Sequence, residues 1–205
     1  LPLMLLPIQL MVLYTREASR LSSLVLVLTL FFVVAGLRRQ VDDLIWPWML
    51  VVCTLASLTR PPWPQGMTVE KVDGQTPIEV VQDLMTLQSR AFGNVDAPRA
   101  SATEARQFRQ RFAALQLFLA RLGDVAVSAS SLTAPYAGIA ELAGVATAAA
   151  FRRRGLAAAL TYAATADAFA QGVEQVFLTA ANADAGRVYA RAGFTAAGSG
   201  LAYLL

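Results

Sequence analysis

The chain has 205 residues, enough for one ordinary domain with an appendage or for two small domains, and 56% of them are hydrophobic and 15% charged. It contains no histidine and a single cysteine, which excludes Cys/His zinc sites, intramolecular disulfides and nucleophilic mechanisms that use histidine as the base. The net charge of +3 comes from scattered arginines without the aromatic-interleaved basic stripe of nucleic-acid-binding proteins, so no nucleic-acid partner is expected.

The apolar excess lies at the front of the chain, in residues 1–58. Residues 21–37 form an uncharged run at the lower length limit for a membrane-crossing helix. The run is also rich in β-branched and aromatic residues, which fit strands buried on both faces of a sheet. Two alternatives therefore stay open for residues 1–58: a membrane-associated segment, or a partial half-domain whose strands, such as PWMLVVC, share a core. Cys53, the last residue of PWMLVVC, is expected to be a buried hydrophobic residue with no chemical role.

Residues 59–66, TRPPWPQG, form the predicted linker, because three prolines and a glycine break both helix and strand. Residues 67–205 then show the alternation of strands and helices that predicts a mixed α/β domain. Pro77 opens the first helix, and Ser101 with Glu104 is a capping-box signature for the second. The predicted strands are 67–72, 115–122, 124–130, 139–147, 174–180 and a closing strand or hairpin at 194–205, and the predicted helices are 77–92, 101–115, 156–171 and 182–193.

Residues 151–157, FRRRGLA, place three arginines and a glycine at the start of an alanine-rich helix. The first N–H groups of a helix have no internal partner and favour an anion, and glycine lets the backbone approach a ligand closely. The loop has neither the lysine of a Walker loop nor the GxGxxG of a Rossmann loop. We predict that it binds a phosphate mainly through its backbone.

Three motifs in this order resemble the GNAT superfamily of N-acetyltransferases. Arg152, Gly155 and Ala157 match the Q/R-x-x-G-x-G/A loop of that family. The stretch ELAGVAT before the loop looks like its central splayed strand, and NADAGRVYARAGF after the loop resembles its second signature, NxxAxxxYxxxGF. The resemblance covers about residues 67–205. It implies the acyl-CoA N-acyltransferase fold, an α+β mixed sheet, with acetyl-CoA as co-substrate and no metal.

The resemblance also implies which residues bind coenzyme A. They are the backbone groups of Val145, Ala146 and Thr147 along the pantetheine arm, the loop residues Arg152, Arg153, Arg154, Gly155, Leu156 and Ala157 around the pyrophosphate, and Asn182 on the cofactor's arm or on the helix that follows.

Acetyl transfer from a thioester to an amine needs a base, an oriented carbonyl and a proton for the thiolate. With histidine absent, a carboxylate is the expected base. Glu141 is the candidate base. Strand alternation places it on the same face as Val145 and Thr147 if no bulge intervenes. Burial in an apolar strand should raise the pKa of Glu141. Tyr189 resembles the family tyrosine that protonates the thiolate. A structural carboxylate and a packing tyrosine are the alternatives for these two residues.

The expected function is transfer of an acetyl or short acyl group from acetyl-CoA to a primary amine on a small molecule or peptide. Direct attack in a ternary complex is expected, because no cysteine is placed to carry the acyl group. The alternatives are a non-catalytic acyl-CoA-binding or sensing module and a membrane-anchored interaction protein. The expected location is the cytoplasm, with membrane association through residues 1–58 and homodimer formation both left open.

Overall fold

The computed structural model describes residues 45–203, which lie within one unit of the chain, residues 42–205. Its strands are β1 Ile45–Thr54, β2 Met67–Val72, β3 Gln116–Leu122, β4 Val125–Leu132, β5 Ile139–Thr147, β6 Gln175–Ala180 and β7 Thr195–Tyr203. Its helices are α3 Ile78–Ala91, α4 Ala102–Arg111, α5 Leu156–Ala170 and α6 Ala183–Ala190, and the short 3₁₀ turn η2, Ala149–Phe151, precedes α5. The mixed α/β architecture predicted from the sequence is confirmed.

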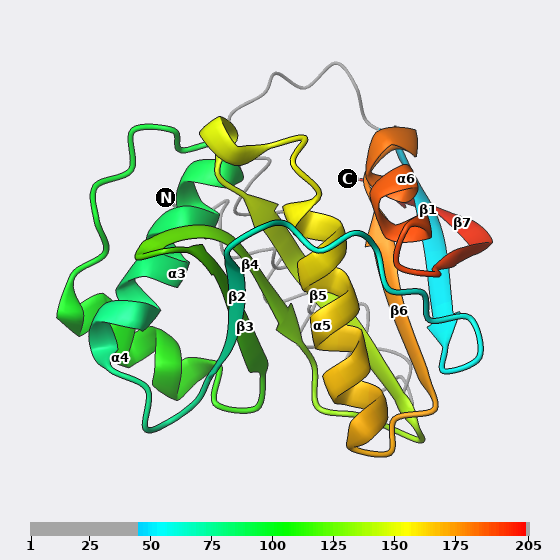
Figure 1. Cartoon of the computed structure of the whole chain (residues 1–205), viewed down its shortest axis with the longest axis horizontal. Coiled ribbons are helices and arrows are strands. Elements are labelled where there is room, and N and C mark those ends of the chain that lie inside the picture. Colours follow the sequence, from blue (N-terminus) through cyan, green and yellow to red (C-terminus); the bar gives the residue numbers. More distant parts are fainter. Residues whose placement is uncertain (1–44, 204–205) are drawn as a thin grey trace. The chain divides into compact units, whose positions relative to one another are not determined.

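The strands form one seven-stranded sheet in the order β2-β3-β4-β5-β6-β1-β7 (Figure 1). Neighbouring strands are antiparallel except β5 and β6, which run parallel. The helix α5 is the crossover that joins this parallel pair, as parallel strands require. The sheet therefore has an antiparallel half on each side of a single parallel junction.

Local sequence signals account for several helix starts. The hydroxyl of Ser101 accepts a hydrogen bond from the backbone N–H of Glu104, and the Glu104 carboxylate accepts one from the N–H of Ser101, at 3.2 and 2.7 Å. This is the reciprocal capping box that the sequence predicts for α4. The helix α3 begins directly after Pro77, whose fixed φ suits a helix start.

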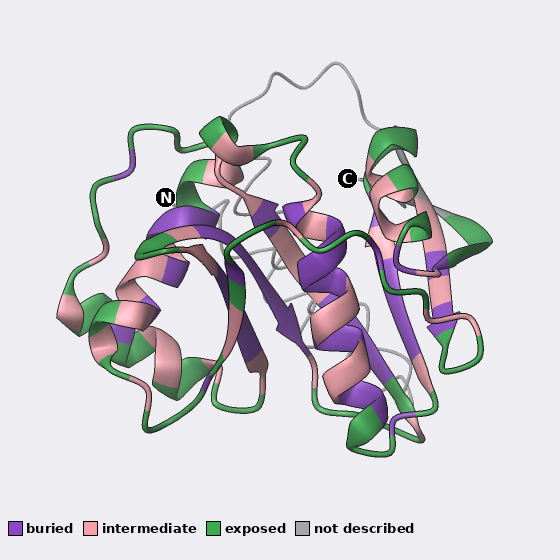
Figure 2. Cartoon of the chain, in the orientation of Figure 1, coloured by how far each residue is buried: buried purple, intermediate pink, exposed green. Residues whose placement is uncertain are grey.

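Helices cover both faces of the sheet, and alternation along each strand decides which face a residue joins. In β3, Phe118 and Ala120 belong to the core under α5, while Leu117 and Leu119 belong to the core under α3 and α4. Figure 2 shows the buried residues gathered on α5 and on the strands behind it. Two cores thus share one sheet, and α5 is the main cover of the larger one.

The position of β1 in the sheet conflicts with the predicted domain boundary. Residues 45–54 fall within the segment 1–58 assigned to an extension, yet β1 pairs with β6 on one side and β7 on the other. Val51 and Cys53 are buried in the core under α5, which confirms the expectation of a buried cysteine. A strand that is paired at both edges and buried on its faces has a continuous apolar sequence. The periodicity of its hydrophobic residues cannot distinguish such a sequence from a buried helix.

The predicted linker, residues 59–66, is consequently a connection inside the domain, between β1 and β2. Within the part of the chain that the structure describes, no helix has the length and hydropathy to cross a membrane. Both alternatives for residues 1–44 lie outside the described residues.

The chain after β1 is fixed to the segment before β7. The N–H of Thr59 donates to the carbonyl of Ala192 at 3.1 Å. Gly193 follows with a φ of +94°, and a β-carbon there would overlap the carbonyl oxygen of Ser57. This close approach of two backbones explains why position 193 needs glycine.

Replacing Gly193 by alanine should lower the free energy of unfolding by more than about 2 kcal/mol, because the new β-carbon displaces the Ser57 backbone and is strained at positive φ. Chemical denaturation measures this loss. Gly172→Ala is the matched control, since its φ of +86° carries the same strain with no described atom within 4 Å. A loss at Gly193 no larger than at Gly172 would contradict the role of the contact.

Candidate active site

The parallel strands β5 and β6 pair only over their first residues. Ile139 to Glu141 pair with Gln175 to Phe177, and the pairing ends there although β5 continues to Thr147 and β6 to Ala180. Over residues 142–147, β5 therefore has a strand partner on its β4 side only, among the described strands. Backbone donors and acceptors at such an edge can bind an extended ligand arm as an added strand would.

A bulge interrupts β5 just before this edge ends. The register with β4 pairs Ala143 with Ser131 and Ala146 with Ala129, so it skips Gly144 and Val145. Gly144 has a φ of +61°, and its carbonyl accepts a hydrogen bond from the Gln88 side chain of α3 at 3.1 Å. The bulge shifts the alternation of β5 by one residue.

The shift corrects the expected grouping of Glu141 with Val145 and Thr147. Cross-strand partners share a face, so Glu141 and Ala143 lie on one face with Ala146, and Thr147 lies on the other. Val145 packs against the core under α5, on the face opposite to Glu141. The regular alternation of side chains along β5 ends at Gly144, where the bulge begins.

The β5 residues expected along the pantetheine arm differ in their backbone partners. The carbonyl of Ala146 accepts from Ser128 at 2.6 Å, and that of Thr147 accepts from Arg152 at 3.2 Å. The ladder with β4 skips Val145 altogether. Val145, in the bulge, is thus the one of the three without a paired residue in β4.

Glu141 is a buried carboxylic acid with an unused oxygen. Its side chain is 1% exposed, and its neighbours Ala140 and Leu142 belong to the core under α5, so the carboxyl group points to the other face. Its Oε2 has no hydrogen-bond partner among the described residues. Burial raises the pKa of Glu141 from 4.5 to about 7. A carboxyl group of this kind can exchange a proton near neutral pH.

The loop before α5 has the backbone shape that the sequence predicts. Arg153 and Gly155 are left-handed, with φ of +62° and +80°, and Gly155 is the N-cap of α5 without a side-chain cap. The first helical hydrogen bond runs from the Ala159 N–H to the Gly155 carbonyl, so the N–H groups of Leu156 and Ala157 have no partner within the helix. Left-handed residues beside a helix start make a concave group of N–H donors that suits an anion.

The three arginines lie at the rim of this loop, and all are exposed. The guanidinium of Arg152 donates to the carbonyl of Thr147, and that of Arg154 donates to the carbonyl of Ala150 at 3.2 Å. Arg154 also lies over the Phe151 ring, 5.1 Å from its centroid. Two of the three side chains are thus tied to the loop itself, and the donors at its centre are backbone groups.

Asn182 and Tyr189 both belong to the α6 segment. The side-chain oxygen of Asn182 accepts from the N–H of Ala185 at 2.9 Å, so of the two expected roles the structure shows the helix cap. Tyr189 packs against the core under α5, with its ring centroid 6.4 Å from that of Phe194. Burial raises the pKa of Tyr189 to about 12, so the phenol keeps its proton at neutral pH.

Two residues of this region were not predicted. Gln88 holds the bulge through the Gly144 carbonyl, but in the sequence it is one polar residue on a helix. Pro64 lies beside the loop, with its Cγ 3.9 Å from the position of a β-carbon on Gly155. No sequence motif marks either residue, because the role of each depends on a contact between distant segments of the chain. Among the described residues there is no group of three or more side chains suited to a metal ion.

The described sheet is mixed, its one parallel strand pair parts after Glu141, and an uncapped helix start follows the longer of these two strands. The model of the acetyltransferase (GNAT) family matches residues 81–194, more than half of the chain. The chain belongs to this family.

Solved structures of the family share the fold. A GCN5-related N-acetyltransferase from Kribbella flavida is 25% identical, with a TM-score of 0.60 over 78% of this chain and 59% of its own. One from Sphaerobacter thermophilus is 21% identical, with a TM-score of 0.57 over 90% of this chain and 56% of its own. The chain therefore spans little more than half the length of these two proteins. No sequence among the curated proteins matches it.

The raised pKa of Glu141 makes a prediction about stability. Between pH 4.5 and about 7 the unfolded chain loses this proton while the folded chain keeps it, so the free energy of unfolding should fall as pH rises through that window and level off above it. The fall is on the order of 3 kcal/mol. Denaturation of wild type and Glu141→Gln across this pH range isolates it, because glutamine has the same shape and no proton to lose. Parallel pH profiles for the two proteins would contradict the burial of an ionisable group.

Proposed function

We propose that the protein transfers an acetyl group from acetyl-CoA to a primary amine on a small molecule or peptide. The observation that carries the proposal is the buried carboxyl group of Glu141 at the point where β5 and β6 stop pairing, whose Oε2 has no hydrogen-bond partner among the described residues. Membership of the GNAT family supports acyl transfer from acetyl-CoA. A structure with the same fold, 18% identical and with a TM-score of 0.50, is described as an aminoglycoside acetyltransferase in complex with sisomicin, an amine-bearing ligand.

Acetyl-CoA would bind along β5 and at the start of α5. The unpaired edge of β5 around Val145 would hold the amides of the pantetheine arm. The N–H groups of Leu156 and Ala157 would donate to the pyrophosphate, while Arg152 and Arg153 at the rim would add positive charge. Asn182 contributes by fixing the start of α6.

The thioester supplies an activated acyl carbon, and the protein's own groups handle the protons. Glu141 takes a proton from the attacking amine as the carbon–nitrogen bond forms, which its pKa of about 7 allows. Tyr189 donates its phenolic proton to the sulfur as the carbon–sulfur bond breaks. The chain's one cysteine is buried in the core beside Ser57, so the acyl group passes directly to the amine.

Thiol release from acetyl-CoA, measured against a library of primary amines, tests the proposal. The rate should rise with pH through an apparent pKa near 7, following the ionisation of Glu141. Glu141→Gln should lower kcat by about 100-fold and leave coenzyme A binding intact, and Tyr189→Phe should lower kcat by about tenfold. Tight coenzyme A binding with no turnover on any amine would instead support an acyl-CoA sensing module.

Substituting Gly155 tests the backbone site. Gly155→Val should abolish coenzyme A binding, because a β-branched residue does not hold a φ of +80° and the loop N–H groups turn away. Gly172→Val is the matched control at the other end of α5, with similar strain at a φ of +86°. Single alanine variants of Arg152 or Arg154 should weaken binding by less than about tenfold, and more at low salt. Losses from each arginine as large as from Gly155→Val would contradict a backbone site.

The cytoplasmic location, membrane association through residues 1–58 and homodimer formation stay predictions. The described residues bear on none of them.

A further inference from the structure

The connection between β1 and β2 passes the start of α5. Figure 1 shows this segment crossing in front of the N-terminal end of the helix on its way to β2. Pro64 lies near the loop there, with its Cγ 3.9 Å from where a β-carbon on Gly155 would be. The connection therefore passes close to any group bound at the loop.

Trp63, next to Pro64, is held in one orientation and partly exposed. Its indole N–H donates to the carbonyl of Met67 at 2.9 Å, and the N–H of Met67 donates to the carbonyl of Pro64 at 3.1 Å. The residue is 37% exposed. The guanidinium of Arg60 lies over the indole, 5.6 Å from the ring centroid. An oriented aromatic ring with a cation beside it suits a ligand in which a planar base is joined to a negatively charged phosphate.

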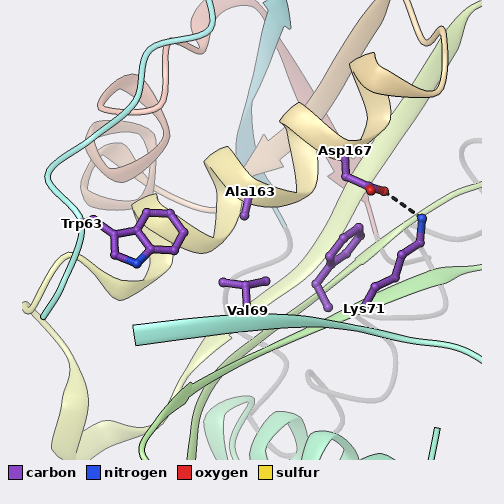
Figure 3. A pocket seen from close by; sticks show the side chains of 6 residues that line it. Trp63, Val69, Lys71, Ala163 and Asp167 are labelled. Carbon is purple, nitrogen blue, oxygen red and sulfur yellow. Dashed lines mark hydrogen bonds and ion pairs between the residues drawn. The ribbon is translucent and has the colours of Figure 1, made fainter. Parts of the chain in front are cut away.

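The indole also borders a hollow between α5 and β2, with a volume of about 340 Å³ (Figure 3). The lining side chains are Trp63, Val69, Lys71, Phe118, Ala163 and Asp167. Lys71 and Asp167 form an ion pair of 2.8 Å toward the C-terminal part of α5, away from Trp63. On α5 the hollow is lined by Ala163 and Asp167, so it runs along the helix from its middle, and Trp63 borders it at the end away from the ion pair.

We propose that Trp63 and Arg60 bind the nucleotide end of coenzyme A. Trp63 stacks on the adenine, and Arg60 pairs with the 3′-phosphate of the ribose. This inference rests on the proposed function, because it takes the pyrophosphate to lie on the N–H groups at the start of α5. Residues 60 and 63 lie outside the stretch 81–194 that the family model matches, so this subsite belongs to the β1–β2 connection of this chain.

Three ligands separate the parts of the site: coenzyme A, dephospho-coenzyme A without the 3′-phosphate, and 4′-phosphopantetheine without the nucleotide. Calorimetry on the full chain should show that Trp63→Leu weakens both coenzyme A and dephospho-coenzyme A by about tenfold and leaves 4′-phosphopantetheine unchanged. Trp63→Phe, which keeps an aromatic face, should retain most of the affinity. Arg60→Ala should weaken coenzyme A alone by about fivefold, which removes its advantage over dephospho-coenzyme A.

Arg111→Ala is the matched control. Arg111 lies over Phe112 at 5.7 Å in the same kind of cation–aromatic pair, but at the C-terminal end of α4, where the other core lies. All three ligands should bind this variant as they bind wild type.

The outcomes separate the two proposals. Absence of coenzyme A binding to wild type would overturn the proposed function and this inference with it. Normal binding by wild type with no change in Trp63→Leu or Arg60→Ala would overturn only the nucleotide subsite. An equal loss for 4′-phosphopantetheine in Trp63→Leu would mean that Trp63 merely supports the loop, and would also overturn it. If Trp63→Leu does not fold, as its melting temperature would show, the ligand selectivity of Arg60→Ala decides.

Discussion

The pairing of β1 between β6 and β7 is the constraint on which the rest of the site depends. In the described sheet β6 and β7 are not neighbours, because β1 lies between them and pairs with both. The strand β6, which is the second strand of the parallel pair, is therefore held in place by β1, the first described element of the chain. The same pairing makes the chain cross the start of α5 before it enters β2, which brings Pro64 against Gly155.

The chemistry follows from how the backbone departs from regularity at the junction. Where β5 and β6 stop pairing, β5 keeps an edge of unused peptide groups, and the bulge at Gly144 reorients the residues along it. Water is excluded from the Glu141 carboxyl group, which raises the pKa of Glu141 to about 7 because the charged form loses its solvation. Packing against the core likewise raises the pKa of Tyr189. Burial thus provides one group that can take a proton and one that keeps its own.

Much of the fold could be predicted because its signals are local. The capping box of Ser101 and Glu104, the alternation in residues 67–72 and the glycine before α5 each act within a few residues. For β1 the sequence left two alternatives open, a membrane-associated segment and a strand that shares a core, since its partners lie more than 100 residues away and its apolar run fits several structures. The bulge was missed for a related reason: Gly144 permits it, but the pairing of β4 with β5 and the Gln88 side chain hold it.

The sequence by itself determined the family, because motif spacing is a property of the chain alone. It also predicted the glycine-containing loop before α5 and, through the absence of histidine, a carboxylate as the expected base. Only the tertiary structure decided which face Glu141 occupies, and that the proline-rich residues 59–66 lie near the loop instead of separating two domains. Each of these depends on which distant segments meet. The register of a sheet and the path of a connection are set by the packing of the whole fold, and no short stretch of sequence encodes them.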